Sequence, residues 1–110
     1  MELRHLRYFV AVADAGSITR AAQVVRVAQP SLSRQLRQLE DELGGPLLDR
    51  RGRRARLTRA GATFLPLARD LVGRADRAVA LMQGQAEPGQ VVLRLVAPET
   101  TVAEDRKSVV

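Results

Sequence analysis

Three short stretches with helical apolar spacing, broken near residues 16 and 27, constrain the fold more than any other feature of this sequence. Apolar side chains that recur every three or four positions form one stripe along a helix. The first two stretches predict helices over residues 3–15 and 18–25, with Gly16 ending the first and Ser17 or Thr19 capping the second. Their stripes are Leu3, Leu6, Phe9, Val10 and Ala13, and then Ile18, Ala21, Ala22 and Val25.

The third stretch predicts a helix from Gln29 to Leu43, entered through a tight connection at residues 26–28 with Val27 turned inward. Pro30 suits its first turn, where the missing N–H costs nothing. The buried face carries Leu32, Leu36, Leu39 and Leu43, and Gly44-Gly45-Pro46 ends the helix. The opposite face begins with Gln29, Ser33, Arg34, Arg37 and Gln38 and ends with Glu40, Asp41 and Glu42. Only the beginning of this face could meet phosphate.

Two short extended segments follow, residues 47–50 and 56–58, on either side of a turn centred on Gly52. This pattern predicts a two-stranded hairpin with an arginine-rich tip. Three helices would then precede a β wing. The alternative is a generic three-helix domain with a charged loop.

A long helix is predicted from Arg59, capped by Thr58, to Gln85, which would extend about 40 Å. Its apolar residues repeat at alternating spacings of three and four, as in a coiled coil. A 58-residue domain cannot cover them all, so we expect a dimerisation helix; the alternative is a helix folded back on its own domain. Pro66 removes one backbone hydrogen bond and is expected to bend the helix. The predicted seam is Leu65, Ala68, Val72, Ala75, Val79 and Met82, broadened by Leu67, Leu71, Ala78 and Leu81.

Residues 86–90 read as a breaker and linker, and residues 91–97 as one buried strand ended by Pro98. A single strand is not a domain, so residues 87–104 are interpreted as a linker and the first strand of a missing domain. We hypothesise that residues 105–110 are a non-native tail, because the chain's only lysine, Lys107, lies there. Ordinary genomic sequence continuing through codon 110 would contradict this hypothesis.

Net charge is +6, and the excess lies in residues 1–58, with 11 arginines against 6 acids. Five arginines fall within seven positions: Arg50, Arg51, Arg53, Arg54 and Arg56. Such a block attracts polyanions through counterion release, which favours nucleic acid. The alternative is a solvated basic surface that aids solubility. Membrane-surface binding fits less well, because the block has no apolar face.

The composition excludes several classes of protein. Without cysteine there is no disulfide, thiolate catalysis or cysteine-ligated zinc. The single histidine, His5, leaves no basis for a metal site or a histidine-based catalytic set, and we interpret it as a helix-surface residue. No apolar run approaches the ~20 residues needed to cross a bilayer. We therefore expect a cytoplasmic protein that is not an enzyme and needs no cofactor.

Several sequence blocks, in order and in register, resemble LysR-type transcriptional regulators: residues 1–13, 16–22, 29–36 with Leu39-Glu40 and Leu43-Gly44, and 57–61. The resemblance covers residues 1 to about 97. It implies a winged helix-turn-helix (residues 1–58), a linker helix that dimerises (59–86) and a C-terminal effector domain, whose small-molecule site this chain would lack. Departures are Ala28, where a Ser or Thr usually caps the recognition helix, and Ile18 and Leu48 in place of phenylalanines.

The resulting hypothesis is sequence-specific binding of double-stranded DNA by a homodimer or higher homo-oligomer. Residues 29–38 would enter the major groove, where an amide can pair with adenine and a guanidinium with guanine. Gln29 and Arg34 are the candidates for reading bases. Pro30, Ser31 and Ser33 would shape the approach and bond to phosphate or bases, and Arg37 would hold phosphate. Arg53 and Arg54 would lie at the minor groove, while Arg50, Arg51 and Arg56 contact the backbone or stabilise the wing. The alternative function is a dimerisation module that pairs with full-length relatives without binding DNA.

Overall fold

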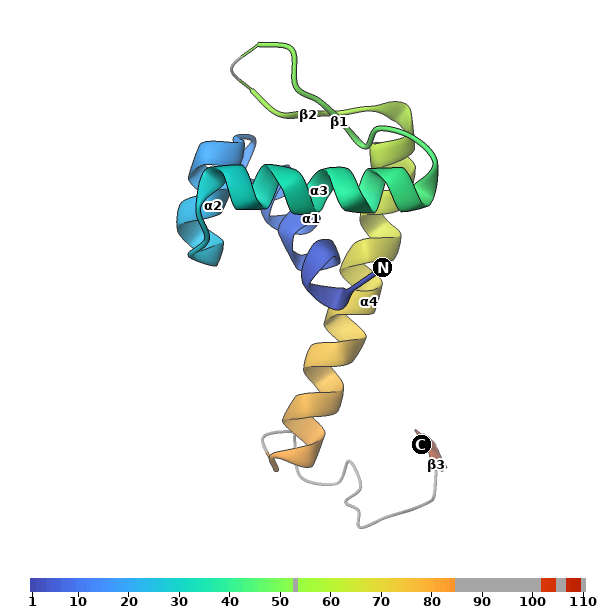
Figure 1. Cartoon of the computed structure of the whole chain (residues 1–110). Helices are drawn as coiled ribbons and strands as arrows, with labels where there is room; N and C mark the ends of the chain where they lie inside the picture. Colours follow the sequence, from blue (N-terminus) through green and yellow to red (C-terminus); the bar gives the residue numbers. More distant parts are fainter. Residues whose placement is uncertain (53, 85–101, 105–106, 110) are drawn as a thin grey trace. The chain divides into compact units, whose positions relative to one another are not determined.

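The computed structural model describes residues 1–52, 54–84, 102–104 and 107–109, in two compact units, residues 1–73 and 74–110. The first unit contains α1 (Leu3–Ala15), α2 (Ile18–Val25), α3 (Gln29–Leu43), β1 (Leu48–Asp49) and β2 (Arg56–Leu57). Helix α4 (Arg59–Met82) begins in this unit and ends in the second. Figure 1 shows α3 crossing in front of α1, and in this view the β1–β2 hairpin lies above α3. The predicted fold class, a mainly helical winged helix-turn-helix, is confirmed.

The ends of the first three helices follow from short-range chemistry, and their predicted bounds are confirmed. Gly16 ends α1 with φ 70°, a left-handed conformation that glycine adopts without strain. Ser17 caps α2 by accepting a hydrogen bond from the Arg20 backbone N–H at 3.2 Å. Ala28 precedes α3 and supplies no side-chain cap. Arg26 takes a left-handed φ of 61°, the one such non-glycine residue in the described chain.

The core lies between α1, α2 and α3. Its largest fully buried side chains are Phe9, Val12, Leu32, Leu36 and Leu39. The buried Ala21 and Ala22 let α2 approach its neighbours closely, as predicted, and Val27 is partly buried against the core. The buried face of α3 is therefore the predicted one for three of its four leucines; the fourth, Leu43 in the last turn, is 42% exposed, and the prediction is wrong there.

The buried face of α1 differs from the predicted stripe. His5, Leu6, Phe9 and Val12 are buried, whereas Leu3 is exposed. Treating His5 as a surface residue is wrong: it is only 4% exposed, and its Nδ1 accepts a hydrogen bond from the Glu2 backbone N–H at 3.3 Å. Positions 5, 9 and 12 share one helix face, which brings His5 under the core residues.

Helix α4 packs on the core through the first part of the predicted dimerisation seam. The Phe64 ring lies 5.7 Å from the Phe9 ring, centroid to centroid. Ala68 is fully buried in the core of its own chain, and Leu65 and Val72 are partly buried against it. The seam prediction is therefore corrected at Ala68, which presents no surface to a partner.

An ion pair reinforces the α1–α4 contact. The Arg69 guanidinium donates two hydrogen bonds to the Asp14 carboxylate, at 2.6 and 3.3 Å. This interaction holds the pKa of Asp14 below its ordinary value, chiefly through the hydrogen bond. Helix α4 continues through Pro66 and ends at Met82, three residues before the predicted Gln85, and Gly84 follows with φ 71°.

The second unit contains a short antiparallel pair, β3 (Val102–Glu104) and β4 (Lys107–Val109). The predicted linker at 86–90 and strand at 91–97 lie outside the described residues. In the part of the chain that is described, no helix combines the length and apolarity needed to cross a membrane.

Candidate nucleic-acid interface

The surface of α3 that faces away from the core forms the first part of the site. Leu32, Leu36 and Leu39 pack into the core, so the side chains on the opposite face of α3 point toward solvent. Gln29, Pro30, Arg34 and Arg37 are exposed, and Ser31 and Ser33 are half-buried.

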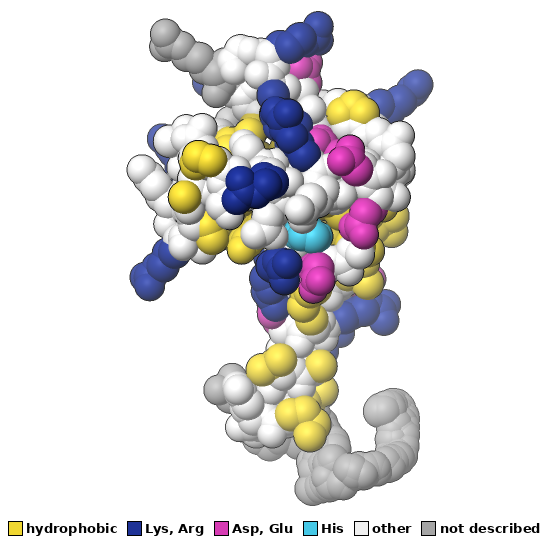
Figure 2. Space-filling view, viewed as in Figure 1, with side chains coloured by type: hydrophobic (Ala, Val, Ile, Leu, Met, Phe, Trp, Pro, Cys, Tyr) yellow, Lys and Arg dark blue, Asp and Glu magenta, His cyan; other side chains and the backbone are white. Residues whose placement is uncertain are grey.

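Charge changes sign along α3. Figure 2 shows basic side chains over the middle of α3 and over the wing, and acidic side chains toward the C-terminal end of the helix. Asp41 and Glu42 are exposed at that end, and Glu42 pairs with the amino group of Met1 at 2.9 Å. A polyanion is therefore attracted to the beginning and middle of α3 and repelled from its end.

A side chain of α2 contacts the first residue of α3. The Thr19 hydroxyl donates a hydrogen bond of 2.9 Å to Oε1 of Gln29. Both side chains are exposed. Thr19 was a candidate cap for α2 on sequence alone, but Ser17 has that role and the Thr19 hydroxyl is used across the turn.

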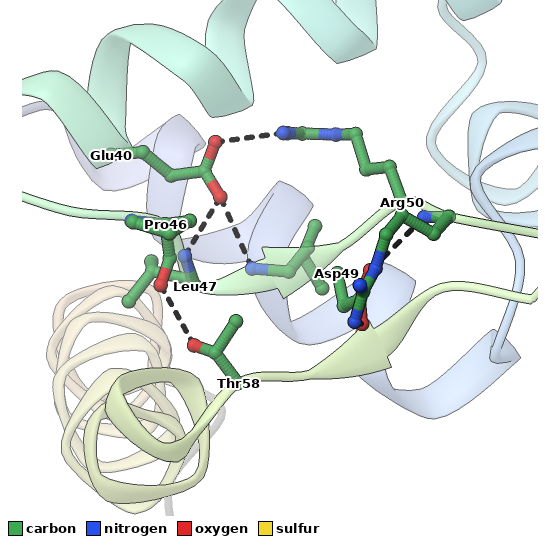
Figure 3. A network of polar contacts seen from close by, with 8 residues as sticks. Glu40, Pro46, Leu47, Asp49, Arg50 and Thr58 are labelled. Atoms are coloured by element: carbon green, nitrogen blue, oxygen red, sulfur yellow. Dashed lines mark hydrogen bonds and ion pairs between the residues drawn. The ribbon is translucent and has the colours of Figure 1, made fainter.

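Glu40 joins α3 to the wing. This carboxylate is only 7% exposed and accepts hydrogen bonds from the backbone N–H groups of Leu47 (2.7 Å) and Leu48 (3.1 Å) through one oxygen. Its other oxygen accepts from Nη1 of Arg50 at 2.9 Å. Figure 3 shows these bonds converging on Glu40. The sequence placed Glu40 on the solvated acidic end of α3, so this contact was missed.

The hairpin places its arginines differently. Leu48 pairs with Leu57 and Asp49 with Arg56 across β1 and β2. Arg50 is held inward by Glu40, and its Nε and Nη2 are buried with no partner in the described chain. Arg54 and Arg56 are exposed at the tip and on β2. Arg53, a predicted minor-groove residue, lies outside the described residues.

Arg51 is bound within the wing but remains open to solvent. Its guanidinium donates to both oxygens of Asp49 at 3.0 and 2.9 Å, and its backbone N–H donates to the same carboxylate. These bonds lower the pKa of Asp49 to about 2. The side chain of Arg51 is 91% exposed, so it can still reach a phosphate.

The wing joins α4 through Thr58 and Gly61. The Thr58 hydroxyl accepts from the Gly61 backbone N–H at 3.0 Å, which confirms Thr58 as the cap of α4, and donates to the carbonyl of Pro46 at 2.7 Å. A Cβ on Gly61 would overlap the carbonyl oxygen of Leu47. Among the described residues no three His, Asp or Glu side chains gather as metal ligands would.

Comparison with known proteins identifies the family of this chain. A family model described as "Bacterial regulatory helix-turn-helix protein, lysR family" matches residues 3–62. The Hca operon transcriptional activator HcaR of Escherichia coli K12 is 54% identical over 78 residues, 71% of this chain and 26% of that protein. The regulator TfdT of Cupriavidus pinatubonensis JMP 134 is 42% identical over 104 residues, 94% of this chain and 46% of that protein. This chain thus spans between a quarter and a half of these relatives.

Solved structures agree with the family assignment. The DNA-binding domain of BenM in complex with benA site 1 DNA is 46% identical, with a TM-score of 0.71 over 78% of this chain and 100% of that one. The DNA complex of the CbnR DNA-binding domain is 42% identical, with a TM-score of 0.71 over 79% of this chain and 100% of that one. The chain therefore belongs to the lysR family of bacterial regulatory helix-turn-helix proteins, and its first four helices and wing have the fold of that family's DNA-binding domains.

Proposed function

We propose that residues 1–58 bind double-stranded DNA sequence-specifically as part of a transcriptional regulator, with α3 in the major groove. One observation carries the proposal: the polar surface at the start of α3 stays exposed while its leucines are buried beneath it. A helix of this width fits the major groove of B-DNA, where each base pair has a distinct hydrogen-bond pattern. The similar BenM and CbnR domains were solved bound to DNA.

Within α3, Gln29 and Arg34 are assigned to base edges. Arg34 is exposed and has no ion-pair or hydrogen-bond partner in the described chain. A free guanidinium can donate two hydrogen bonds to O6 and N7 of guanine, and an amide can pair with N6 and N7 of adenine. Pro30 is assigned to shaping how the start of α3 approaches the duplex. Ser31, Ser33 and Arg37 are assigned to donating hydrogen bonds to phosphate oxygens.

The wing supplies the second contact. Arg54 is assigned to the adjacent minor groove, where a narrow A·T tract concentrates negative potential, and the sequence-based assignment of Arg53 to the same groove is kept. Arg51 and Arg56 are assigned to the phosphate backbone, in keeping with their exposure. Arg50 is assigned a structural role, because its hydrogen bond to Glu40 links the start of the hairpin to α3.

Helix α4, with residues 59–86 as the linker, is assigned to dimerisation. Five large apolar side chains remain exposed on it: Leu67, Leu71, Val79, Leu81 and Met82. Burying such residues between two chains is favourable by about 25 cal/mol per Å² of apolar surface. This set keeps Val79 and Met82 of the predicted seam. It leaves out Leu65, Ala68 and Val72, which contact their own core, and the half-buried Ala75. Two copies would place two α3 helices on two half-sites.

The proposal is tested by selecting bound sequences from a random duplex pool with the 110-residue chain. We expect one enriched motif, arranged as two half-sites. Arg34→Ala is expected to lose preference at one base pair, by about 1–3 kcal/mol, roughly 5- to 150-fold. Arg77→Ala removes the same charge from an exposed site on α4 and should leave that preference unchanged. Absence of binding to any duplex between low and physiological salt would contradict the proposal and favour the dimerisation module.

A further inference from the structure

The contact between Thr19 and Gln29 joins the two helices of the helix-turn-helix at the point where DNA would be read. Thr19 lies in the first turn of α2 and Gln29 is the first residue of α3. The bond from the Thr19 hydroxyl to Oε1 of Gln29 measures 2.9 Å, so it is a well-formed hydrogen bond rather than a long contact. Figure 1 shows α2 beside the beginning of α3.

We infer that Thr19 is a positioning residue that sets which base Gln29 prefers; this rests on the proposed function. A glutamine side chain has three rotatable bonds and one face that donates and one that accepts hydrogen bonds. A solvated glutamine samples many orientations, and ordering it on DNA costs conformational entropy. The Thr19 bond removes part of that cost before DNA arrives.

The hydrogen bond also determines which donors and acceptors of Gln29 remain available to the duplex. Oε1 is occupied on one side by the Thr19 hydroxyl, whereas the Gln29 NH₂ group has no acceptor in the described chain. The site therefore offers two N–H donors and one remaining oxygen lone pair. This pattern suits the N7 edge of a purine, and adenine best, because its N6 amino group can use the remaining lone pair.

The two residues that flank Gln29 in the sequence do not hold its side chain. Ala28, directly before Gln29, has no side-chain hydrogen-bonding group and does not cap the helix. Pro30, directly after it, has no N–H to hold the amide. In the described structure Gln29 is thus oriented by a residue on another helix.

The test uses Thr19→Val, which keeps the side-chain shape and removes the hydroxyl. The base pair read by Gln29 is first defined as the one whose preference is lost in Gln29→Ala. We expect Thr19→Val to reduce the preference at that base pair roughly two- to tenfold, to leave other base pairs unchanged and to keep affinity for non-specific duplex. Thr19→Ser, which restores a hydroxyl, should recover the preference.

Two controls separate positioning from simpler roles. Thr63→Val makes the same chemical change at an exposed site on α4 and should change no base preference. In the Gln29→Ala background, Thr19→Val should have no further effect, because the side chain that it positions is gone.

The outcomes are distinct. If Thr19→Val weakens all sequences equally, Thr19 contacts the DNA backbone itself and the inference is wrong. If Thr19→Val keeps the wild-type preference at that base pair, Gln29 needs no positioning and the inference is again wrong while the proposed function stands. If the wild-type chain shows no base preference anywhere, the proposed function itself fails.

Discussion

Gly61 lies in a close contact between two segments of backbone. It lies in the first turn of α4, and the carbonyl oxygen of Leu47 fills the space that a Cβ would need. That same oxygen accepts a hydrogen bond from the Thr58 backbone N–H at 3.0 Å. A side chain at position 61 would therefore push the start of α4 away from the segment that leads into β1.

Gly61→Ala is expected to lower the free energy of unfolding by about 1–3 kcal/mol, because overlap in a tight contact forces the backbone to shift. Urea denaturation of the purified chain measures it. Gly73→Ala is the matched control: a Cβ there meets nothing within 4 Å, and alanine in a helix interior is favoured by about 0.5–1 kcal/mol over glycine. Equal effects of the two substitutions would argue against the close approach.

Asp49 is the wing residue most sensitive to acid. Hydrogen bonds from the Arg51 side chain and backbone lower its pKa from 3.8 to about 2 in the folded chain. A lowered pKa means that the stabilisation is present above the unfolded value and is lost as pH falls through the folded one. The Asp49–Arg51 contact should therefore weaken between about pH 4 and pH 2, and remain intact at neutral pH.

An NMR titration of the Asp49 carboxyl group checks this, with a midpoint expected near 2. In Arg51→Ala the side-chain donor is lost, so the midpoint should move up toward the ordinary value of an aspartate. A midpoint that stays unchanged in Arg51→Ala would show that another group holds the carboxylate ionised.

The recognition helix and the wing are coupled through Glu40. Its buried carboxylate accepts three hydrogen bonds, two of them from the backbone of residues 47 and 48. The wing sheet has only two residues in each strand. We therefore expect the hydrogen bonds to Glu40 to contribute much of what orients the wing relative to α3.

Glu40→Gln is expected to lower the free energy of unfolding by about 2–3 kcal/mol, since Arg50 loses its charge partner while part of its guanidinium stays buried. Glu42→Gln, which loses only an exposed pair with the N-terminal amine, should cost less than about 1 kcal/mol. Thermal unfolding of both variants measures the difference. Similar losses in the two would mean that the Glu40 network contributes little.

How much of this could be predicted from sequence depends on the range of the interactions. The bounds of α1, α2 and α3 follow from Gly16, Ser17 and the leucine spacing, all of which act within a few residues. The outward surface of α3 follows from the same spacing. Glu40 and Ala68 were placed wrongly or incompletely because their partners come from other elements, whereas His5 was misplaced although its hydrogen bond from the Glu2 backbone N–H lies within the first turn of α1. A polar residue on a helix reads as solvated until the groups that bury it are known.

The exposed apolar residues of α4 form the dimer contact that we propose. Leu67 is 57% exposed and Met82 is 85% exposed, whereas Ala68, which follows Leu67 in the sequence, is fully buried in its own core. Single exposed apolar residues are common on monomers. A row of them on one helix is less so, because each leaves apolar surface in water.

Leu71→Glu combined with Leu81→Glu is therefore expected to convert a dimer into a monomer, since each substitution would bury an unpaired charge in the interface. Sedimentation equilibrium of the whole chain measures the mass. Ala62→Glu adds a negative charge at an exposed position on the opposite face of α4 and should leave the dimer intact. The monomeric variant should still bind one half-site, more weakly than the dimer binds two, because the second contact is no longer intramolecular. A wild-type chain that sediments as a monomer at high concentration would exclude α4 as the dimer contact and leave α3 and the wing to act alone.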